Sequence, residues 1–341
     1  MDKIEFRNVS KTFALSGSGF SKASLHAVRN VSFSIRQGQT LAVVGESGCG
    51  KTTLARLLMK LHEPTSGQII VDGQDVATLK SNAQLEQYRS KIQMIFQDPF
   101  ASLNPAHTVQ RIIGRAITLH QKSLSAGEVR TRVCRLLELV GLTPTEDYLG
   151  KHPAQLSGGQ RQRIVIARAL AVNPDVIVAD EPTSMLDVSI GIDIMNLLLD
   201  LKEFQNLTMM YITHNLASAR YMADHMVVMY AGTCVEFGPI GDLVEAPCHP
   251  YTILLLNSTP EPFREKQLAI SAVETPPDLI SGKAQCMFSR RCPMAQGRCH
   301  CTEPPELVFG KRRIKCYLYE GMEQLDNIPV SVGIYTKDIG G

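Results

Sequence analysis

The sequence predicts an α/β protein with an inserted helical subdomain and a small cysteine-rich C-terminal domain. Three observations lead to this prediction. An apolar run at residues 40–44 passes through a glycine-rich loop into a helical pattern. Residues 109–140 then place apolar side chains at helical spacings. Finally, five of the nine cysteines fall within residues 286–316.

Length and composition are those of an ordinary globular protein. A chain of 341 residues with 44% apolar content suits one large domain and a smaller one. The formal net charge of +2 gives no strong field for nucleic acid, so we expect no nucleic-acid partner. No run approaches the roughly 18 apolar residues of a membrane span, and the N-terminus has no signal-peptide core. We therefore expect neither secretion nor a membrane span, and reduced thiols.

The first segment is expected to form two strands, at residues 4–13 and 27–35, joined by a Gly/Ser connection at 16–22. Phe13 ends the first strand. An aromatic ring there either stacks on an adenine base or packs in the core. We expect Phe13 to stack on the base.

Residues 45–52 fit the P-loop pattern G-x-x-x-x-G-K-[ST]. Gly45 and Gly50 let the backbone N–H groups wrap a phosphate, Lys51 adds a positive charge, and Thr52 offers a hydroxyl to Mg²⁺. The strand before and the helix after place the loop at a helix N-terminus, where anions bind. A glycine-rich turn without a ligand is the alternative. The predicted nucleotide-binding residues here are Gly45, Ser47, Gly48, Cys49, Gly50, Lys51, Thr52 and Thr53.

The middle of the chain changes character. Strands are expected at residues 67–71 and 91–96, the second ending in Gln97. The helical stretch that follows contains Ser-Ala-Gly-Glu at 125–128, which predicts a capping box. We expect a helical subdomain at about residues 98–160, inserted into the α/β core.

A Ser-Gly-Gly turn at residues 157–159 feeds another helical pattern, which predicts a second anion site, although such turns are common at helix starts. The apolar strand 176–179 then ends in Asp180 and Glu181. Open α/β sheets bind ligands at that edge. Asp180 can orient Mg²⁺ and its waters, and Glu181 can polarise an attacking water, whereas without the P-loop an acidic turn would be the better reading.

A further strand at 208–212 ends near His214. A lone histidine in such a place is usually a capping or core residue. The presence of the other nucleotide-binding motifs in the same chain favours a functional role for His214 instead.

These motifs stand in the order found in ATP-binding cassette (ABC) proteins, which the chain resembles over about residues 3–258. In that family two nucleotide domains enclose two ATP molecules, so the signature of this chain would face the γ-phosphate on a partner's P-loop. Met185 departs from the small residue usual there, which bears on packing across the dimer seam. The resemblance implies that Gln97 is the Q-loop glutamine and that Thr52, Gln97 and Asp180 are the Mg²⁺ ligands. It implies that Glu181 is the catalytic glutamate, Asp187 the D-loop aspartate and His214 the switch histidine. The signature residues that it implies are Ser157, Gly158, Gly159 and Gln160.

A narrower resemblance lies downstream. Cys-His-Pro-Tyr-Thr-Ile-Leu-Leu at 248–255, a proline-rich link at 260–277 and the spaced cysteines are similar to ATP-binding subunits of oligopeptide, dipeptide and nickel importers. Residues 97–105 lie, in such importers, near where a membrane subunit docks; a plain surface loop is the alternative. The expected domains are a nucleotide-binding domain at 1–258 and the transporter C-terminal domain at 259–341.

The narrower resemblance implies an ATPase that uses ATP and Mg²⁺ to drive uptake of di- and oligopeptides. Its implied partners are a second ABC ATPase subunit in a heterodimer, two transmembrane permease subunits and, indirectly, an extracytoplasmic solute-binding protein. Its implied location is peripheral, on the cytoplasmic face of the cell membrane. Nickel or a metal chelate stays open as the solute, because no residue of this chain is expected to touch the solute.

The cysteines Cys286, Cys292, Cys299 and Cys316 are expected to bind a [4Fe-4S] cluster with a structural role. About 80 residues containing eight prolines are poorly equipped to build a core alone. Four thiolates suit such a cluster, and the spacings lack the C-x₂-C pairs of structural zinc. Zinc and unligated thiols or disulfides remain alternatives, as does Cys301 in place of Cys299.

Two other functions compete with the importer subunit. One is a soluble cassette ATPase for DNA repair or translation, but the chain has neither a second P-loop nor a long coiled-coil insertion. The other is an iron–sulfur regulatory protein whose ATPase is secondary. Whether hydrolysis follows membrane partners or redox state separates the latter from the importer.

Overall fold

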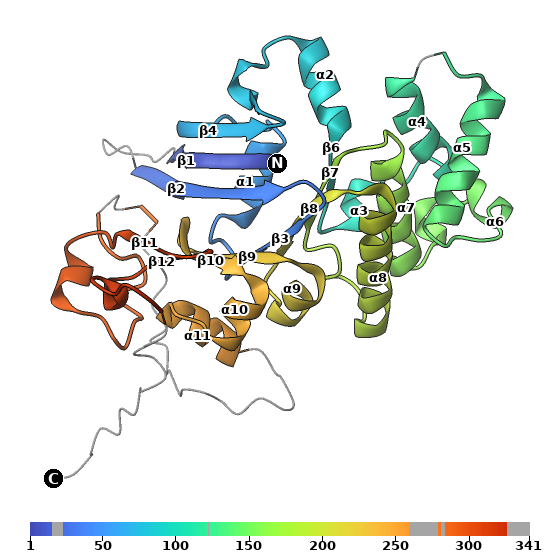
Figure 1. The fold of residues 1–341 in the computed structure, drawn as a ribbon. Coiled ribbons are helices and arrows are strands. Elements are labelled where there is room, and N and C mark those ends of the chain that lie inside the picture. Colours follow the sequence, from blue (N-terminus) through green and yellow to red (C-terminus); the bar gives the residue numbers. More distant parts are fainter. Residues whose placement is uncertain (16–22, 122, 259–278, 281–283, 326–341) are drawn as a thin grey trace.

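A computed structural model describes residues 1–15, 23–121, 123–258, 279–280 and 284–325. The predicted Gly/Ser connection and the prolines at 260–277 lie outside these residues. Two sheets face each other with helix α1 between them, while α9, α10 and α11 cover the other face of the larger sheet (Figure 1). Helices α4, α5 and α6 project from the far end of the molecule.

The smaller sheet is antiparallel and has the strand order β2-β1-β4-β5. Alternating residues of β1 point into the core, where Phe6 stacks on Phe33 of β2 with ring centroids 4.5 Å apart. The two strands predicted before the P-loop are confirmed. The bounds are β1 (Asp2–Leu15), β2 (Ala23–Arg36), β4 (Ser66–Val71) and β5 (Gln74–Asp75).

The larger sheet has the order β11-β12-β10-β9-β3-β8-β7-β6. Its strands β9, β3, β8, β7 and β6 are parallel, and three antiparallel strands extend one edge. The central strands β3, β7 and β8 are buried along their whole length, as expected of a parallel sheet covered on both faces. The bounds are β3 (Thr40–Val44), β6 (Ile92–Ile95), β7 (Val176–Asp180), β8 (Thr208–Thr213), β9 (His225–Tyr230), β10 (Thr233–Pro239), β11 (Glu306–Phe309) and β12 (Arg312–Lys315).

Several helices begin at a residue whose side chain caps the helix N-terminus. The capping box predicted at 125–128 is confirmed, with Ser125 and Glu128 bonded to each other's backbone. Within the described residues, no helix is long and apolar enough to cross a membrane. The helices are α1 (Lys51–Leu58), α2 (Asn82–Lys91), α3 (Pro99–Ser102), α4 (Val109–His120), α5 (Ala126–Leu139), α6 (Glu146–Leu149), α7 (Gly158–Leu170), α8 (Val188–Gln205), α9 (Leu216–Met222), α10 (Ile240–Glu245) and α11 (Pro250–Asn257), with 3₁₀ turns η1 (Val76–Thr78), η2 (Pro153–Gln155), η3 (Gly297–His300) and η4 (Tyr317–Tyr319).

The C-terminal hairpin β11–β12 joins the larger sheet through β10. Glu236 of β10, which is fully buried, accepts hydrogen bonds from Arg312 Nη2 at 2.7 Å and from the backbone N–H groups of Cys248 and His249, each at 3.0 Å. Tyr319 Oη donates to the Cys248 carbonyl oxygen at 2.6 Å. The cysteine-rich segment therefore shares a core with the residues before it, and a domain boundary at 258 stays a prediction.

Candidate active site

The P-loop turns between β3 and α1 with glycines where no side chain fits. Gly45 has φ +150° and Gly50 has φ +105°. A Cβ atom on Gly45 would lie 2.2 Å from the Met229 carbonyl oxygen, and one on Gly50 would lie 2.3 Å from that of Ala27. Both residues must therefore be glycine for the loop to pack against its neighbouring strands.

The loop opens onto a hollow of about 650 Å³. Lys51, itself buried, donates from Nζ to the carbonyl oxygens of Gly45 at 2.7 Å and Glu46 at 2.9 Å, so its charge lies at the mouth of the loop. Phe13 lines the same hollow, which places an aromatic ring where a nucleotide base could stack. Cys49 differs from the other loop residues because its side chain is buried in the core beneath the loop. The predicted residues that line the hollow are Phe13, Gly45, Ser47, Gly48, Gly50, Lys51, Thr52, Thr53, Gln97, Glu181 and His214.

Thr52 and Asp180 meet beside the loop. The Thr52 hydroxyl donates to Asp180 Oδ1 at 3.4 Å, and Asp180 is a buried residue at the end of β7. Burial raises the pKa of the Asp180 carboxyl, and the hydrogen bond from Thr52 opposes that shift. A carboxylate that loses hydration in this way is stabilised by a cation, so the donor set of Thr52, Gln97 and Asp180 fits Mg²⁺.

Gln97, Glu181 and His214 come from the ends of three adjacent strands and meet at one carboxylate. Gln97 Nε2 donates to Glu181 Oε2 at 3.0 Å, and His214 Nδ1 lies 3.2 Å from Glu181 Oε1. Glu181 has φ +46°, a strained conformation for a side chain of this type, and its backbone N–H donates to the Ile212 carbonyl at 2.9 Å. The arrangement presents a carboxylate flanked by an amide and an imidazole, next to the phosphate loop.

The Leu-Ser-Gly-Gly-Gln motif lies elsewhere on the surface. Ser157 caps α7 in a capping box with Gln160. A Cβ atom on Gly158 would contact Leu186, in the D-loop at 184–187, and one on Gly159 would contact Ile190 of α8. In the described chain, neither these four residues nor Asp187 lines the P-loop hollow. The two predicted anion sites of one chain are therefore separate.

In the cysteine-rich segment, Cys286, Cys292, Cys299 and Cys316 are among the residues that line one small cavity of about 20 Å³. Cys301 is exposed and does not line it. Burial raises the pKa of Cys292 and that of Cys316 to about 12. In the part of the chain that the structure describes, no group of three His, Cys, Asp or Glu side chains is arranged to hold a metal ion.

Sequence reasoning missed two contacts to the P-loop. The Glu46 backbone N–H donates to Tyr251 Oη at 2.9 Å, and the Glu46 carboxylate pairs with Arg291. Tyr251 belongs to the transporter motif at 248–255, but that motif predicts no role for it. Nothing in the pattern of residues around Arg291 indicated its partner, because the two lie 245 residues apart.

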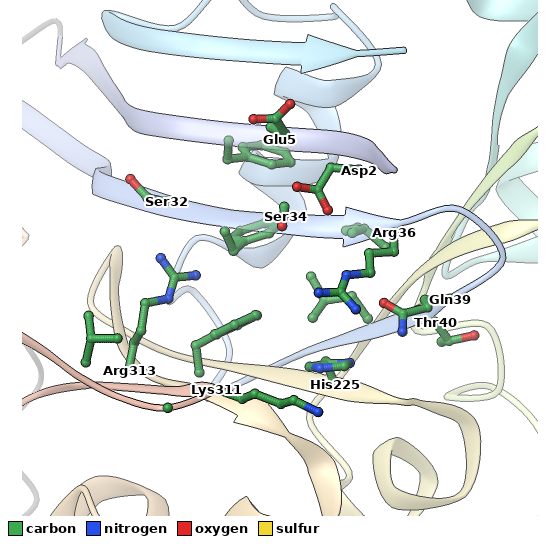
Figure 2. A pocket seen from close by; sticks show the side chains of 17 residues that line it. Asp2, Glu5, Ser32, Ser34, Arg36, Gln39, Thr40, His225, Lys311 and Arg313 are labelled. Carbon is green, nitrogen blue, oxygen red and sulfur yellow. The ribbon is translucent and has the colours of Figure 1, made fainter. Parts of the chain in front are cut away.

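A second hollow, of about 550 Å³, separates the small sheet from the C-terminal hairpin. Figure 2 shows Asp2 and Glu5 on its small-sheet side and Lys311 and Arg313 on the hairpin side, with Arg36 projecting from the end of β2. No predicted site residue of the described chain lines it. Of these two hollows, the P-loop hollow is the one that gathers predicted site residues.

Comparisons with known proteins agree with this geometry. Residues 28–184 match the ABC transporter family, and residues 235–299 match the C-terminal region of oligopeptide/dipeptide transporters. The oligopeptide transport ATP-binding protein AppF of Bacillus subtilis is 40% identical over 326 residues, which cover 93% of this chain and 97% of that protein. The di/tripeptide transport ATP-binding protein DppF of Pseudomonas aeruginosa is 43% identical over 300 residues, 86% of this chain and 90% of that protein.

Among solved structures, the post-hydrolysis dimer of the ATP-binding cassette MJ0796, bound to ADP and Pi, is similar with a TM-score of 0.62 and 32% identity. The alignment covers 70% of this chain and 98% of the MJ0796 chain. The structure of cbiO1 from Clostridium perfringens gives a TM-score of 0.60 at 26% identity. The alignment covers 72% of this chain and 91% of the cbiO1 chain. The chain therefore belongs to the ATP-hydrolysing, ATP-binding subunits of ABC transporters, in the group that includes oligopeptide and dipeptide transport proteins.

Proposed function

We propose that this chain is one of two ATPase subunits of an importer for di- and oligopeptides, located on the cytoplasmic face of the cell membrane. Family membership and the transport roles that its relatives are named for support the transport role. The observation that carries the ATPase role is the meeting of Gln97, Glu181 and His214 beside the P-loop. Peptides are favoured over nickel because the named relatives are peptide transport proteins.

The residues of the hollow divide the work of hydrolysis. Lys51 and the loop N–H groups bind the phosphates, and Thr52, Gln97 and Asp180 would hold Mg²⁺, which neutralises phosphate charge when bound. Glu181 accepts a proton from the attacking water. Gln97 and His214 hold the Glu181 carboxylate in place, and His214 also senses the γ-phosphate.

Separation of the signature from the P-loop supports a dimer in which each chain completes the other's site. Beside the signature, the D-loop and the start of α8 expose apolar side chains: Met185 is 57% exposed and Val188 82%. Such residues are candidates for burial against a second nucleotide domain. We propose that this domain belongs to a different ATPase subunit, and that Met185 packs in the seam where the family usually has a smaller residue.

The region after β6 offers a docking surface for a permease subunit. A hollow of about 620 Å³ runs between Arg56, Phe96 and Ala101 and reaches Gln97 and Asp180 of the ATP site. Phe96 is 42% exposed. A helix of a membrane subunit seated there would contact Gln97 directly, which supports coupling between transport and hydrolysis.

We further propose the finer division of the chain: a nucleotide-binding domain at 1–258 with a helical subdomain at about 98–160, and a C-terminal domain at 259–341. In that C-terminal domain, Cys286, Cys292, Cys299 and Cys316 would hold a [4Fe-4S] cluster. Four thiols around one cavity support this donor set.

Reconstitution tests the function. The chain is co-purified with its permease subunits and partner ATPase, placed in vesicles with the solute-binding protein, and supplied with labelled dipeptide, oligopeptide or nickel. We expect Mg-ATP-dependent peptide uptake that stops when Glu181 is changed to Gln. Nickel uptake without peptide uptake would show that the chain serves a metal importer instead. ATPase activity that is the same with and without the permease subunits would contradict the proposal.

A further inference from the structure

The carboxylate of a P-loop residue is held by the cysteine-rich segment. Glu46 follows the first glycine of the loop, and its two oxygens pair with the two terminal nitrogens of Arg291. Nη1 lies 2.8 Å from Oε2 and Nη2 lies 2.9 Å from Oε1. This is the bidentate geometry that gives arginine–carboxylate pairs their directional strength.

Arg291 is itself fixed by an aromatic group. Its guanidinium carbon lies 5.6 Å from the ring centroid of Tyr230 and 5.9 Å from that of Phe288, and Nη1 donates to Tyr230 Oη at 3.4 Å. The Arg291 side chain is 13% exposed, whereas that of Glu46 is 41% exposed. The arginine is therefore the anchored partner, and the loop residue is the one that would move without it.

The same aromatic group holds the Glu46 backbone. Tyr251 accepts the Glu46 N–H, and its ring packs against Tyr230 and Phe288 with centroids 4.7 and 5.5 Å apart. Lys51 Nζ contacts the Glu46 carbonyl oxygen as well. The backbone N–H, the backbone carbonyl and the side chain of Glu46 are thus all restrained, within a loop that must present its N–H groups to phosphate.

We propose that Arg291 is a positioning residue for nucleotide binding. It fixes Glu46 and neutralises a carboxylate that would otherwise repel nucleotide phosphates from the loop. Arg291 directly precedes Cys292, and Phe288 lies between Cys286 and Cys292, so the order of the cysteine-lined segment is transmitted to nucleotide affinity. The inference rests on the ATP site and holds whatever solute is carried.

The first test is Arg291→Gln in the full-length chain, with Arg290→Gln as its matched control. Arg290 is exposed, and among the described residues no hydrogen bond or ion pair involves its side chain. Equilibrium binding of a fluorescent ATP analogue should show a Kd raised about tenfold for Arg291→Gln, the size expected for a bidentate charged pair, and no change for Arg290→Gln. Arg291→Lys keeps the charge without the fork, so it should recover part of the affinity.

The assembled complex separates positioning from damage to the fold. Arg291→Gln should raise KM for ATP by a similar factor and leave kcat within about twofold, because Arg291 touches none of the reacting groups. A fall in kcat at unchanged KM would overturn the proposal. Circular dichroism melting of each variant shows whether the chain remains folded.

Changing the partner decides whether Arg291 acts through Glu46. In a Glu46→Gln chain, whose amide needs no counter-charge, Arg291→Gln should have no further effect on Kd. Cys292→Ser should weaken nucleotide binding in the native chain and not in the Glu46→Gln chain. The same tenfold loss from Arg291→Gln in both backgrounds would show that the arginine acts by another route, and unchanged affinity in Cys292→Ser would remove the link to the cysteine segment.

Discussion

The ion pair between Glu236 and Arg312 predicts that the C-terminal hairpin is part of the main fold. The Glu236 side chain is 0% exposed and that of Arg312 is 9% exposed, with Nη2 and Oε1 2.7 Å apart. Arg312→Met would leave a buried carboxylate with two backbone N–H donors and no counter-ion. Removing one partner of such a pair costs about 3–5 kcal/mol of unfolding free energy.

Arg313 provides the matched control in the next position. Its pair with Glu306 is 3.9 Å long and partly exposed, and its guanidinium also lies over Phe237. Arg313→Met should therefore cost about 1 kcal/mol or less. Adding Glu236→Gln to Arg312→Met removes the stranded charge, so the double variant should be more stable than Arg312→Met alone.

Urea denaturation followed by far-UV circular dichroism measures these differences, since the chain has no tryptophan to report by fluorescence. Limited proteolysis within β11–β12 shows whether the hairpin opens before the rest of the chain. Equal, small losses for Arg312→Met and Arg313→Met would refute the reasoning, because a hairpin that merely rests on the sheet would not depend on its buried charge.

Three further predictions concern the sites. Lys51→Ala removes the ammonium at the P-loop and should weaken ATP binding at least tenfold, measured by equilibrium binding; unchanged affinity would remove its role in binding phosphate. His214→Ala should lower turnover about 10²–10⁴-fold with little change in ATP affinity, because the contact to Glu181 matters when water and γ-phosphate are aligned; loss of folding instead would indicate a structural histidine. Anaerobically purified protein should be brown with about four irons per chain, and Cys292→Ser should lose them; stoichiometric zinc without iron would contradict the cluster.

Much of the nucleotide site could be predicted from the sequence because its signals are local. The P-loop, the buried strands 176–180 and 208–213 and the capping box at Ser125 each lie within a few residues of chain, so pattern and chemistry identify them together. The shared role of Gln97, Glu181 and His214 was implied by the family resemblance, and the structure brings the three side chains together at the ends of adjacent parallel strands.

The features that sequence reasoning missed depend on distant partners or lack a pattern. Helix α2 is polar almost all round, with Tyr88 its one buried residue, so it shows no apolar stripe. Strand β12 is short and finds its partner β10 more than 70 residues away. The pairing of Arg291 with Glu46 is set by how the aromatic group packs, which no local spacing encodes.

The central claim is that Glu181 is the base of an ATPase whose site is completed by a second nucleotide domain. Glu181→Gln preserves the shape of the side chain and its contacts with Gln97 and His214 but cannot accept a proton. Single-turnover hydrolysis in the assembled complex, with ATP occupancy measured in parallel, tests this most directly. We predict retained ATP, a more stable dimer and turnover reduced about 10²–10⁴-fold at this site; hydrolysis at the native rate would contradict the assignment.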